Sequence, residues 1–367
     1  MTEQPTPPPT GHEATHAQPV DPAYYAYYYG YGQQQQPAAP APRRPNFGLL
    51  VGLCGVFLVF ALCMVTSSLT QGAGEDSATP RALTEITVSG EGEDKIALIE
   101  LKGVIAEQQT TGGGMFGVQV NLVERLEREF AQAGADDKVK AVLFRIDSPG
   151  GTVSASDQIW HVVSEFRRTQ NKPVIVHMGG TCASGGYYIA VACDALICEP
   201  TTITGSIGVI LSTLNFSELL KKYGVSDVTI KSGANKDLLN STAPPNAEHL
   251  EILQGMVDES HARFVELVAK GRPIDPETVA KLADGRIYTA KQALKHKLVD
   301  GIGYREDALA EVRKRAKLGK AKLVRYRAPT PTFLDAISGN ANTTPAIAPT
   351  LLDQVTGPRL LVLWRGR

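Results

Sequence analysis

The chain has 367 residues, a formal net charge of −1 and 43% hydrophobic residues. A balance so close to neutral offers no global field that would attract nucleic acid, and the length allows one catalytic domain with accessory segments. Five cysteines do not make a disulfide framework, and no Cys or His cluster has the spacing of a metal site, so no metal or other cofactor is expected. Cys193 and Cys198 could pair across a turn, but two buried free thiols are the preferred interpretation.

The N-terminal part of the chain differs in composition from the rest. Residues 1–46 are rich in Pro, Gln, Ala and Tyr, which predicts a disordered tail. Residues 47–66 are uncharged and long enough, at about 1.5 Å per residue, to cross a membrane as a helix. Because Arg43 and Arg44 precede this segment and the first charges after it are acidic, the tail is expected in the cytoplasm and the remainder outside. A cleavable signal peptide is the alternative, which the long polar region before the apolar run disfavours.

A polar linker at 67–92 is expected to lead to a globular domain at 93–327. Its first half alternates between strands and helices, which predicts an α/β fold with parallel strand pairing. The expected strands are 95–101, 139–146, 173–178, 195–198 and 203–211, and the expected helices are 154–168 and 184–192, with a further helix through Val120, Leu122, Leu126 and Phe130. After residue 236 the pattern becomes helical, at 248–270, 276–282, 290–296 and 305–316.

Ser184 follows an apolar β-branched run and the small residues of a glycine-rich turn that leads into a helix. This arrangement would lift the hydroxyl clear of a sheet as a nucleophile. Upstream, a second strand-like run ends in a Pro-Gly-Gly turn, which can direct backbone N–H groups toward a ligand. The amides of Gly150 or Gly151, together with that of Gly185, are therefore the candidate donors of an oxyanion hole.

The sequence leaves the general base open. The seven histidines lie in the N-terminal tail or on helix-like polar patterns, apart from His177, which has no evident acidic neighbour in the sequence. A neutral lysine is the remaining candidate, because burial disfavours the ammonium form. Spacing alone does not select one lysine.

Four segments in this order resemble the signal peptide peptidases of the SppA type, which are membrane-bound bacterial serine proteases. The segments are 147–151 (Asp-Ser-Pro-Gly-Gly), 183–190 (Ala-Ser-Gly-Gly-Tyr-Tyr-Ile-Ala), 204–209 (Thr-Gly-Ser-Ile-Gly-Val) and 283–288 (Ala-Asp-Gly-Arg-Ile-Tyr). The resemblance covers about residues 93–327. It implies a ClpP/crotonase-like spiral fold, which the pattern of elements alone does not give.

The resemblance also implies the rest of the site. The family uses a Ser–Lys dyad, and the sequence Ser-Gly-Ala-Asn-Lys-Asp at 232–237 matches the context of the family's lysine, which assigns the base to Lys236. Ser206 matches a serine that lies near the lysine ammonium in the family. Single-domain relatives form rings in which the serine of one subunit faces the lysine of its neighbour. A homo-oligomeric ring on the bacterial cytoplasmic membrane, which degrades signal-peptide remnants and other apolar peptides, is therefore expected.

Two other functions stay open at this point. A crotonase-type acyl-CoA enzyme would use similar paired N–H groups, but CoA substrates are cytosolic, whereas this domain is expected outside the membrane. A non-catalytic membrane scaffold of the same fold is the other alternative. The C-terminal tail, 328–367, ends in an apolar and basic run that could dock on a neighbouring domain by adding a strand, contact lipid headgroups or remain frayed.

Overall fold

The computed structural model describes residues 83–111, 118–327 and 360–363, and every structural statement below refers to them. The expected N-terminal tail and membrane span, residues 1–66, lie outside these ranges. No helix within the described ranges is both long and apolar enough to cross a membrane. The described residues all belong to one compact unit of the chain, Ala78–Arg367.

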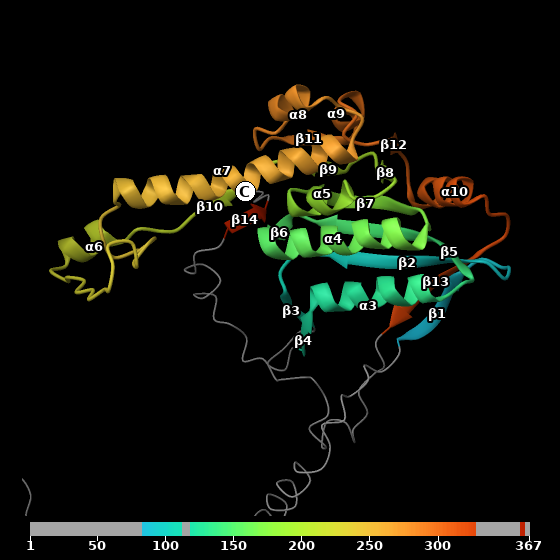
Figure 1. Ribbon diagram of the computed structural model, residues 1–367, viewed down its shortest axis with the longest axis horizontal. Coiled ribbons are helices and arrows are strands. Elements are labelled where there is room, and N and C mark those ends of the chain that lie inside the picture. The colour runs from blue at the N-terminus through green and yellow to red at the C-terminus, as the bar shows by residue number, and fades with distance from the viewer. Residues whose placement is uncertain (1–82, 112–117, 328–359, 364–367) are drawn as a thin grey trace, which may run out of the picture. The chain divides into compact units, whose positions relative to one another are not determined.

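A mixed β-sheet forms the centre of this unit, with the strand order β1-β13-β2-β5-β7-β8-β12 (Figure 1). The strands are β1 (Thr84–Ser89), β13 (Lys322–Arg327), β2 (Lys95–Lys102), β5 (Val139–Ser148), β7 (Val174–Ala183), β8 (Ala195–Cys198) and β12 (Gly301–Ile302). All neighbours along this path are parallel except β1 and β13. In addition, β9 (Ile203–Gly205) pairs in parallel with β7, and β11 (Ile287–Thr289) pairs antiparallel with β9.

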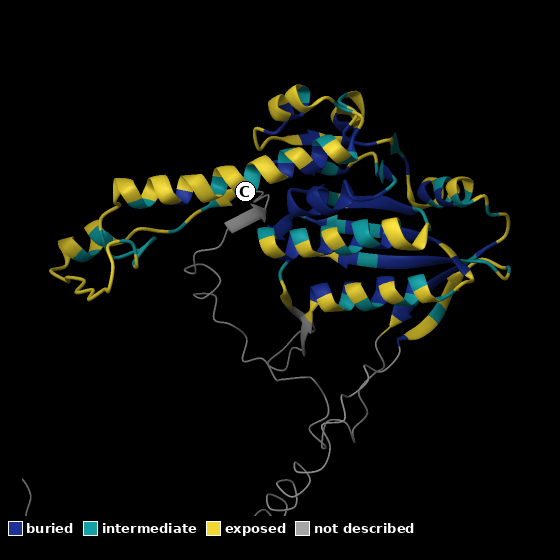
Figure 2. Cartoon of the chain, viewed as in Figure 1, coloured by how far each residue is buried: buried dark blue, intermediate teal, exposed yellow. Residues whose placement is uncertain are grey.

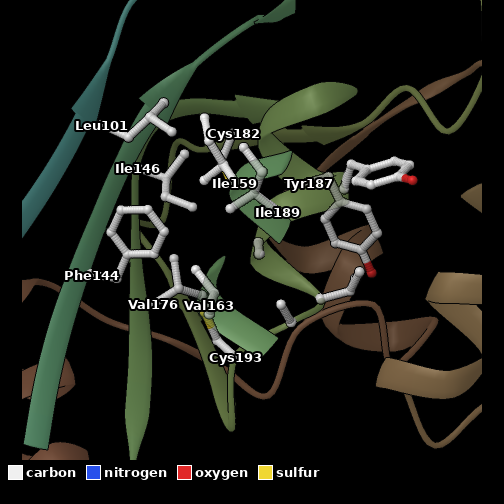
Figure 3. Close-up of a cluster of buried hydrophobic side chains, with 14 of the residues drawn as sticks. Leu101, Phe144, Ile146, Ile159, Val163, Val176, Cys182, Tyr187, Ile189 and Cys193 are labelled. Carbon is white, nitrogen blue, oxygen red and sulfur yellow. The ribbon is translucent and has the colours of Figure 1, made fainter. Parts of the chain in front are cut away.

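The central strands are buried because helices and apolar side chains cover both faces of the sheet (Figure 2). The helices are α3 (Leu122–Ala135), α4 (Val153–Gln170), α5 (Gly185–Ala190), α6 (Ser217–Lys222), α7 (Ala247–Gly271), α8 (Pro276–Leu282), α9 (Ala290–Lys295) and α10 (Arg305–Ala316). The larger apolar cluster joins α3, α4 and α5 to one face, and a smaller cluster lies beneath α10 on the other. Figure 3 shows part of the larger cluster, where Phe144, Ile146 and Val176 of the sheet face Ile159 and Val163 of α4. Near-continuous apolar strands are typical of parallel sheets covered on both faces.

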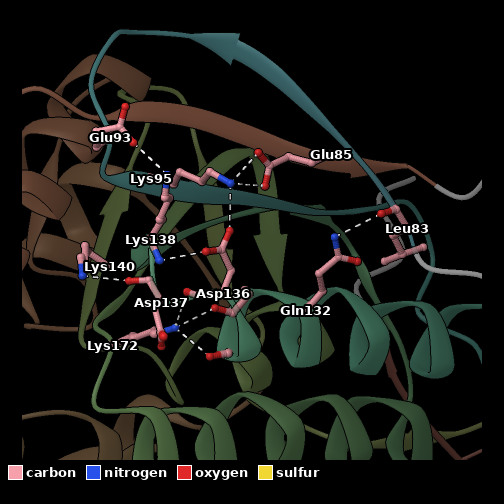
Figure 4. Close-up of polar contacts among 12 residues, drawn as sticks. Leu83, Glu85, Glu93, Lys95, Gln132, Asp136, Asp137, Lys138, Lys140 and Lys172 are labelled. Carbon is pink, nitrogen blue, oxygen red and sulfur yellow. Dashed lines mark hydrogen bonds and ion pairs between the residues drawn. The ribbon is translucent and has the colours of Figure 1, made fainter.

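Polar contacts fix the edge of the sheet against α3 (Figure 4). The Lys95 ammonium on β2 forms ion pairs with Glu85 on β1 and with Asp136 at the end of α3. The Lys172 ammonium donates to the carbonyl oxygens of Ala133, Gly134 and Asp136, at 2.8–3.0 Å. A cation bonded to the last carbonyls of a helix stabilises its C-terminus. These contacts hold the N-terminal strand and α3 on the body that carries the site.

The sequence predicts this α/β alternation correctly, with four differences. The expected strand 203–211 is two strands, β9 and β10 (Ile210–Leu211), because the chain turns between them with a positive φ at Gly205 and Ser206. The strand expected at 173–178 continues to Ala183, so the glycines before Ser184 extend β7 and do not form the turn. Val120 belongs to β4 (Val118–Asn121), which pairs with β3 (Gln108–Thr111), and α3 begins after it. The sheet also starts earlier than expected, since β1 lies within the range assigned to the linker 67–92.

Residues 212–256, here called the arm, extend from the end of β10 through α6 into the first part of α7. Figure 1 shows α6 and the start of α7 lying beyond the sheet. Many of the arm's apolar side chains are exposed, including Leu219, Tyr223, Val225, Val228 and Ile230, the last of which is 97% exposed. A soluble monomer rarely leaves so many apolar side chains together in water, so the arm has the composition of a contact surface.

A second, small sheet lies beside α5 and has the order β10-β14-β6. Its central strand is β14 (Leu360–Leu363), near the end of the chain, and β6 (Gly150–Thr152) contains the Gly-Gly pair. Both pairings of β14 are antiparallel, and they place Val362 opposite Gly151 and Leu361 opposite Ile210. The C-terminal run therefore adds a strand, as in the first of the three arrangements that the sequence left open, although the sheet belongs to its own chain.

Candidate active site

Ser184 lies at the junction between β7 and α5, where its backbone is strained. It is the N-cap residue of α5 with φ 52° and ψ −117°, and it is 1% exposed. A positive φ is uncommon for a residue with a side chain and often marks a functional position. The Ser184 Oγ atom is buried without a hydrogen-bond partner among the described residues. A buried hydroxyl of this kind is free to react with or bind a group that the single chain does not supply.

Two backbone hydrogen bonds hold Ser184 in this position. Its amide donates to the Gly205 carbonyl oxygen at 2.7 Å, and its own carbonyl accepts from the Tyr188 amide at 2.8 Å. Gly185 starts α5, so its amide belongs to the first turn, where no intrahelical acceptor exists. Gly186 packs against the end of β5, since a Cβ atom there would lie 3.1 Å from the Ser148 carbonyl oxygen. The Gly185 amide therefore stands beside Ser184, as the sequence predicts for an oxyanion-hole donor.

The structure places Gly150 and Gly151 in β6, next to α5. The Gly150 amide donates to Ser148 Oγ at 3.0 Å, so it is already bonded within the turn. Gly151 is closely packed, because a Cβ atom on it would lie 1.8 Å from the Ile105 carbonyl oxygen. Of the two predicted donors, Gly151 is consequently the better candidate.

Sequence reasoning did not single out Ser148 or Ile105, which hold this turn. Ile105 donates its amide to the Gly150 carbonyl and accepts from the Thr152 amide, both at 2.8 Å. It comes from the loop after β2, far from β6 in the sequence, so no local pattern could reveal it. Ser148 lies inside the Asp-Ser-Pro-Gly-Gly segment, and its position two residues before Gly150 is the usual spacing for a side chain that caps a turn.

Ser206 directly follows β9, whose last residue, Gly205, is hydrogen-bonded to Ser184. Its neighbour Gly205 accepts the Ser184 amide hydrogen bond, and its own amide donates to the Arg286 carbonyl at 2.8 Å. Ser206 is 8% exposed and lines a pocket of about 290 Å³ with Asp258 and His261 of α7. The structure thus brings Ser184, Ser206 and the glycine donors into one region, although no hydrogen bond joins the two serine hydroxyls.

Lys236 is not brought to Ser184 within the chain. It is exposed in the arm, and its loop is tied to the start of α7 by the bond from Asn235 Nδ2 to Glu248 Oε1 at 3.2 Å. Farther along α7, the Phe264 ring packs on Tyr188 of α5 with 4.9 Å between ring centroids. Glu248 lies sixteen residues before Phe264, which corresponds to roughly 24 Å along the helix axis. The loop of Lys236 and the helix of Ser184 therefore contact opposite ends of α7.

Neither His177 nor the buried cysteines are suited to act as the base for Ser184 or as a second nucleophile. Glu199 Oε1 lies 3.5 Å from His177 Nε2, an acidic neighbour that the sequence did not reveal. However, His177 lies seven residues before Ser184 on β7, and burial, with Arg145 nearby, lowers its pKa to about 4. Cys193 and Cys198 are buried free thiols, as expected, and Cys182 is a third. Burial raises the pKa of Cys198 to about 11. Such thiols carry almost no thiolate at neutral pH.

Known proteins with similar sequences include several peptidases. The profile described as "Peptidase family S49" matches residues 166–319. A protein named "Putative signal peptide peptidase SppA" from Enterococcus faecium is 38% identical over 73% of this chain and 76% of its own length. "Putative protease slr0021" from Synechocystis is 41% identical over 58% of this chain and 72% of its own length. "Serine protease SPPA, chloroplastic" from Arabidopsis thaliana is 31% identical over 72% and 40%, respectively.

Among solved structures, a ClpP1 mutant from Listeria monocytogenes matches 58% of this chain and 94% of its own, with 18% identity and a TM-score of 0.38. The Enterococcus protein shares 38% identity with this chain across most of both proteins, which establishes the family. The chain belongs to peptidase family S49 and is a serine peptidase similar to the SppA signal peptide peptidases.

Proposed function

We propose that this peptidase is a membrane-anchored endopeptidase that uses Ser184 and Lys236 as a dyad and degrades signal peptides left in the membrane after secretion. One observation carries the proposal. Ser184 is a buried hydroxyl without a hydrogen-bond partner in the described chain, and it starts a helix beside two strand edges that pair with an extended segment. An extended peptide bound in this way would lie across the nucleophile.

The mechanism follows from the chemistry of the named groups. Neutral Lys236 accepts the proton of the Ser184 hydroxyl while Oγ attacks the peptide carbonyl carbon. The N–H groups of Gly151 and Gly185 would stabilise the negative charge on the carbonyl oxygen. The Lys236 ammonium then donates its proton to the leaving amine, and a water molecule, deprotonated by the same lysine, hydrolyses the acyl-enzyme. In this scheme Ser206 helps to orient the Lys236 amine.

We infer that Lys236 acts on the Ser184 of a neighbouring subunit. Within one chain the two residues lie toward opposite ends of α7, and the arm that carries Lys236 exposes its apolar side chains. A second copy of the chain would cover these side chains and receive the lysine. A head-to-tail interface that closes on itself gives a ring, in which each site is completed once.

The substrate class and the location rest on the sequence. The uncharged run 47–66 supports a single-pass anchor, and the arginines before it support an extracytoplasmic peptidase domain. A catalytic domain tethered just outside the bilayer would meet apolar peptides that leave it. A groove that binds main chain by strand pairing would accept an unfolded peptide and exclude folded proteins.

The decisive experiment is labelling of the full-length, detergent-solubilised protein with a fluorophosphonate probe. We expect one modified residue, Ser184, identified by mass spectrometry, and loss of both labelling and cleavage of a synthetic signal peptide in Ser184→Ala. Ser89→Ala, an exposed position on β1, is the matched control and should retain both. Normal cleavage by Ser184→Ala would refute the assignment. A CoA thioester turned over in place of the peptide would instead support the acyl-CoA alternative.

A further inference from the structure

The pocket beside Ser206 has the size and the chemistry of a site for one long side chain. Its volume is about 290 Å³, at the lower limit of the roughly 300–1,000 Å³ that small-molecule sites span. We propose that this pocket binds a lysine or arginine side chain of the peptide substrate, close to the bond that is cleaved. This inference rests on the proposed function, because it takes a peptide bound at Ser184 as the substrate.

The pocket adjoins the candidate nucleophile. β9 runs parallel to the end of β7, and the last pair of these strands joins Gly205 to Ala183. Ser206 and Ser184 are the residues that follow the two strands, and both have a positive φ, of 50° and 52°. A side chain in the pocket would therefore belong to a residue of the bound peptide near the carbonyl that Ser184 attacks.

Ser206 offers a hydroxyl that the described chain leaves without a partner. The residue is 8% exposed and lines the pocket, yet its hydroxyl forms no hydrogen bond with the described residues. Buried polar groups are nearly always paired, so an unpaired one that lines a pocket indicates a ligand. A hydroxyl can accept two hydrogen bonds, so this role is compatible with the contact to the Lys236 amine proposed above.

Two further side chains of the pocket accept hydrogen bonds. Asp258 on α7 has no ion-pair partner in the described residues, and its carboxylate accepts a hydrogen bond from Gln254 Nε2 at 2.7 Å. His261 Nε2 lies 2.8 Å from the Ala283 carbonyl oxygen. Because a carbonyl cannot donate, Nε2 carries the hydrogen, and Nδ1 of the neutral ring is left as an acceptor.

The charge of the pocket is negative. Asp258 and Asp284 line it, and no lysine or arginine of the described chain does so. Asp284 is paired with Arg286, whereas the charge of Asp258 is not balanced. Residues 248–259, in the first half of α7, contain four carboxylates and no lysine or arginine. A cleft lined by charges of one sign attracts groups of the opposite sign, so this pocket favours a cation.

The other walls of the pocket are apolar and suit the stem of a basic side chain. They include Val209, Ile210, Val257 and Ala283. Lysine and arginine have an aliphatic stem that packs on apolar surface while the charged end stays with polar partners. A norleucine could make the same apolar contacts but could not bond to the Asp258 carboxylate. The pocket should therefore distinguish a basic side chain from an apolar one of similar length.

Such a subsite would direct cleavage to one part of a signal peptide. A signal peptide has a positively charged region followed by an apolar region. The last basic residue of the first region lies next to the start of the second. A peptide that places this residue in the pocket would be cleaved near the boundary between the two regions.

Peptide binding can be measured without catalysis by fluorescence anisotropy, on the full-length, detergent-solubilised protein carrying Ser184→Ala. The probes are N-terminally acetylated peptides of leucine and alanine with a C-terminal fluorescein and a single lysine, which is placed at each position in turn. Norleucine replaces the lysine in the matched probes. At one position we expect the lysine peptide to bind about tenfold more tightly, which is the effect of one hydrogen bond to a charged group.

Three variants test whether Asp258 causes this preference. Asp258→Asn should remove it, so that the lysine and norleucine peptides bind equally. Asp258→Lys should reverse it and favour a glutamate at the same position, a result that a distortion of α7 would not produce. Glu259→Gln removes a charge from the next residue of α7, outside the pocket, and is the matched control that should keep the preference for lysine.

Equal binding of the lysine and norleucine peptides at every position, within twofold, would overturn the proposal. So would a preference for lysine that survives Asp258→Asn. Tight binding of a norleucine peptide only when its N-terminus is not acetylated would assign the pocket to a terminal ammonium and refute the side-chain subsite. Failure of Ser184 to react with a fluorophosphonate would instead refute the dyad and leave the binding preference standing, so the two outcomes are separable.

Discussion

At the scale of single residues, the site and the fold depend on positions where a side chain is excluded or a buried polar group has no hydrogen bond. Ser184 has a strained backbone and a buried hydroxyl that the described chain does not bond. Gly151 faces a carbonyl oxygen at a distance that no Cβ atom tolerates. His177 is buried, and neither of its ring nitrogens has a hydrogen bond within the described residues. Two of these positions, Gly151 and His177, give the predictions below, and Ser184 is the proposed nucleophile.

Replacement of Gly151 by alanine should abolish activity. The added methyl group would lie 1.8 Å from the Ile105 carbonyl oxygen, so β6 must move away from Ile105. The amide of residue 151 would then no longer be placed to donate a hydrogen bond to an oxyanion. Loss of one oxyanion donor reduces kcat by at least about 100-fold. Gly319→Ala is the matched control, because its Cβ atom would have no neighbour within 4 Å. Steady-state cleavage of a synthetic signal peptide provides the measurement, and a kcat for Gly151→Ala within threefold of wild type would rule out this role for β6.

His177 should make the fold sensitive to acid. Its pKa falls from the ordinary 6.5 to about 4 in the folded chain, because burial and the nearby Arg145 and Arg305 oppose protonation. Between pH 6.5 and 4 the unfolded chain therefore binds more protons than the folded one, and the free energy of unfolding decreases as the pH falls. The loss at pH 4.5 relative to pH 7 is about 2 kcal/mol.

Urea denaturation of wild type and His177→Leu at the two pH values isolates this contribution. Leucine does not titrate, and the two proteins contain the same carboxylates, so the acidic residues contribute equally to both. The wild type should lose about 2 kcal/mol more than the variant on acidification. Parallel losses in the two proteins would show that His177 is not the source of the acid sensitivity.

At the scale of elements, one polar network joins α5, which follows Ser184, to α7, which follows the loop of Lys236. Tyr188 of α5 donates its hydroxyl to Asp157 Oδ1 of α4 at 2.6 Å. Arg263 of α7 donates to the same oxygen through Nε at 2.8 Å and Nη2 at 2.6 Å, and it lies over the Trp160 ring. The Asp157 carboxylate therefore helps to hold α7 on α5, together with the packing of Phe264 on Tyr188.

The Asp157→Asn variant should show whether Asp157 positions α7 for catalysis or contributes to peptide binding. The amide keeps the volume of the carboxylate but removes the charge that Arg263 and Tyr188 share, at a cost of about 2 kcal/mol in stability. Because the change alters how α7 lies on α5 and leaves the groove intact, kcat should fall severalfold while KM for a short peptide stays the same. Glu165→Gln, in an exposed pair with Arg168 on the same helix, should change neither quantity. A rise in KM with unchanged kcat would contradict this positioning role.

The elements that could be predicted from the sequence are those with strong local signals. Helices α8 and α10 begin and end where their patterns indicate, because Asp275 caps the first and charged residues fill the outer turns of the second. β7 was predicted too short, since glycines 179 and 180 normally break a strand, but here the Asp147 carboxylate accepts the Thr181 amide and the pairing continues. Contacts between distant segments, such as Ile105 with β6, left no local signal. The position of β14 likewise depends on a groove that no local pattern describes.

At the scale of the whole molecule, the described residues do not bring all the predicted site residues together. The Ser184 hydroxyl, the glycine donors and Ser206 share one region of the body, whereas the loop of Lys236 is fixed to the far end of α7. The family resemblance predicts Lys236 as the base, and in the described residues Lys236 is exposed in the arm and does not reach Ser184. The exposed apolar side chains of the arm lie on the same segment as Lys236, so one subunit contact could both bury them and deliver the amine.

A shared dyad predicts complementation between two inactive proteins. Ser184→Ala retains Lys236, and Lys236→Ala retains Ser184, so a mixed ring contains some interfaces where an intact serine meets an intact lysine. With equal amounts and random exchange, roughly a quarter of the interfaces are complete, and activity should recover to about that fraction of wild type. Ser184→Ala/Lys236→Ala mixed with Lys236→Ala is the matched control, which contains no intact lysine and should stay inactive. Peptide cleavage after exchange in detergent, with mixed rings verified by native mass spectrometry, gives the answer. Verified mixed rings without activity would mean that each chain completes its own dyad by moving the arm.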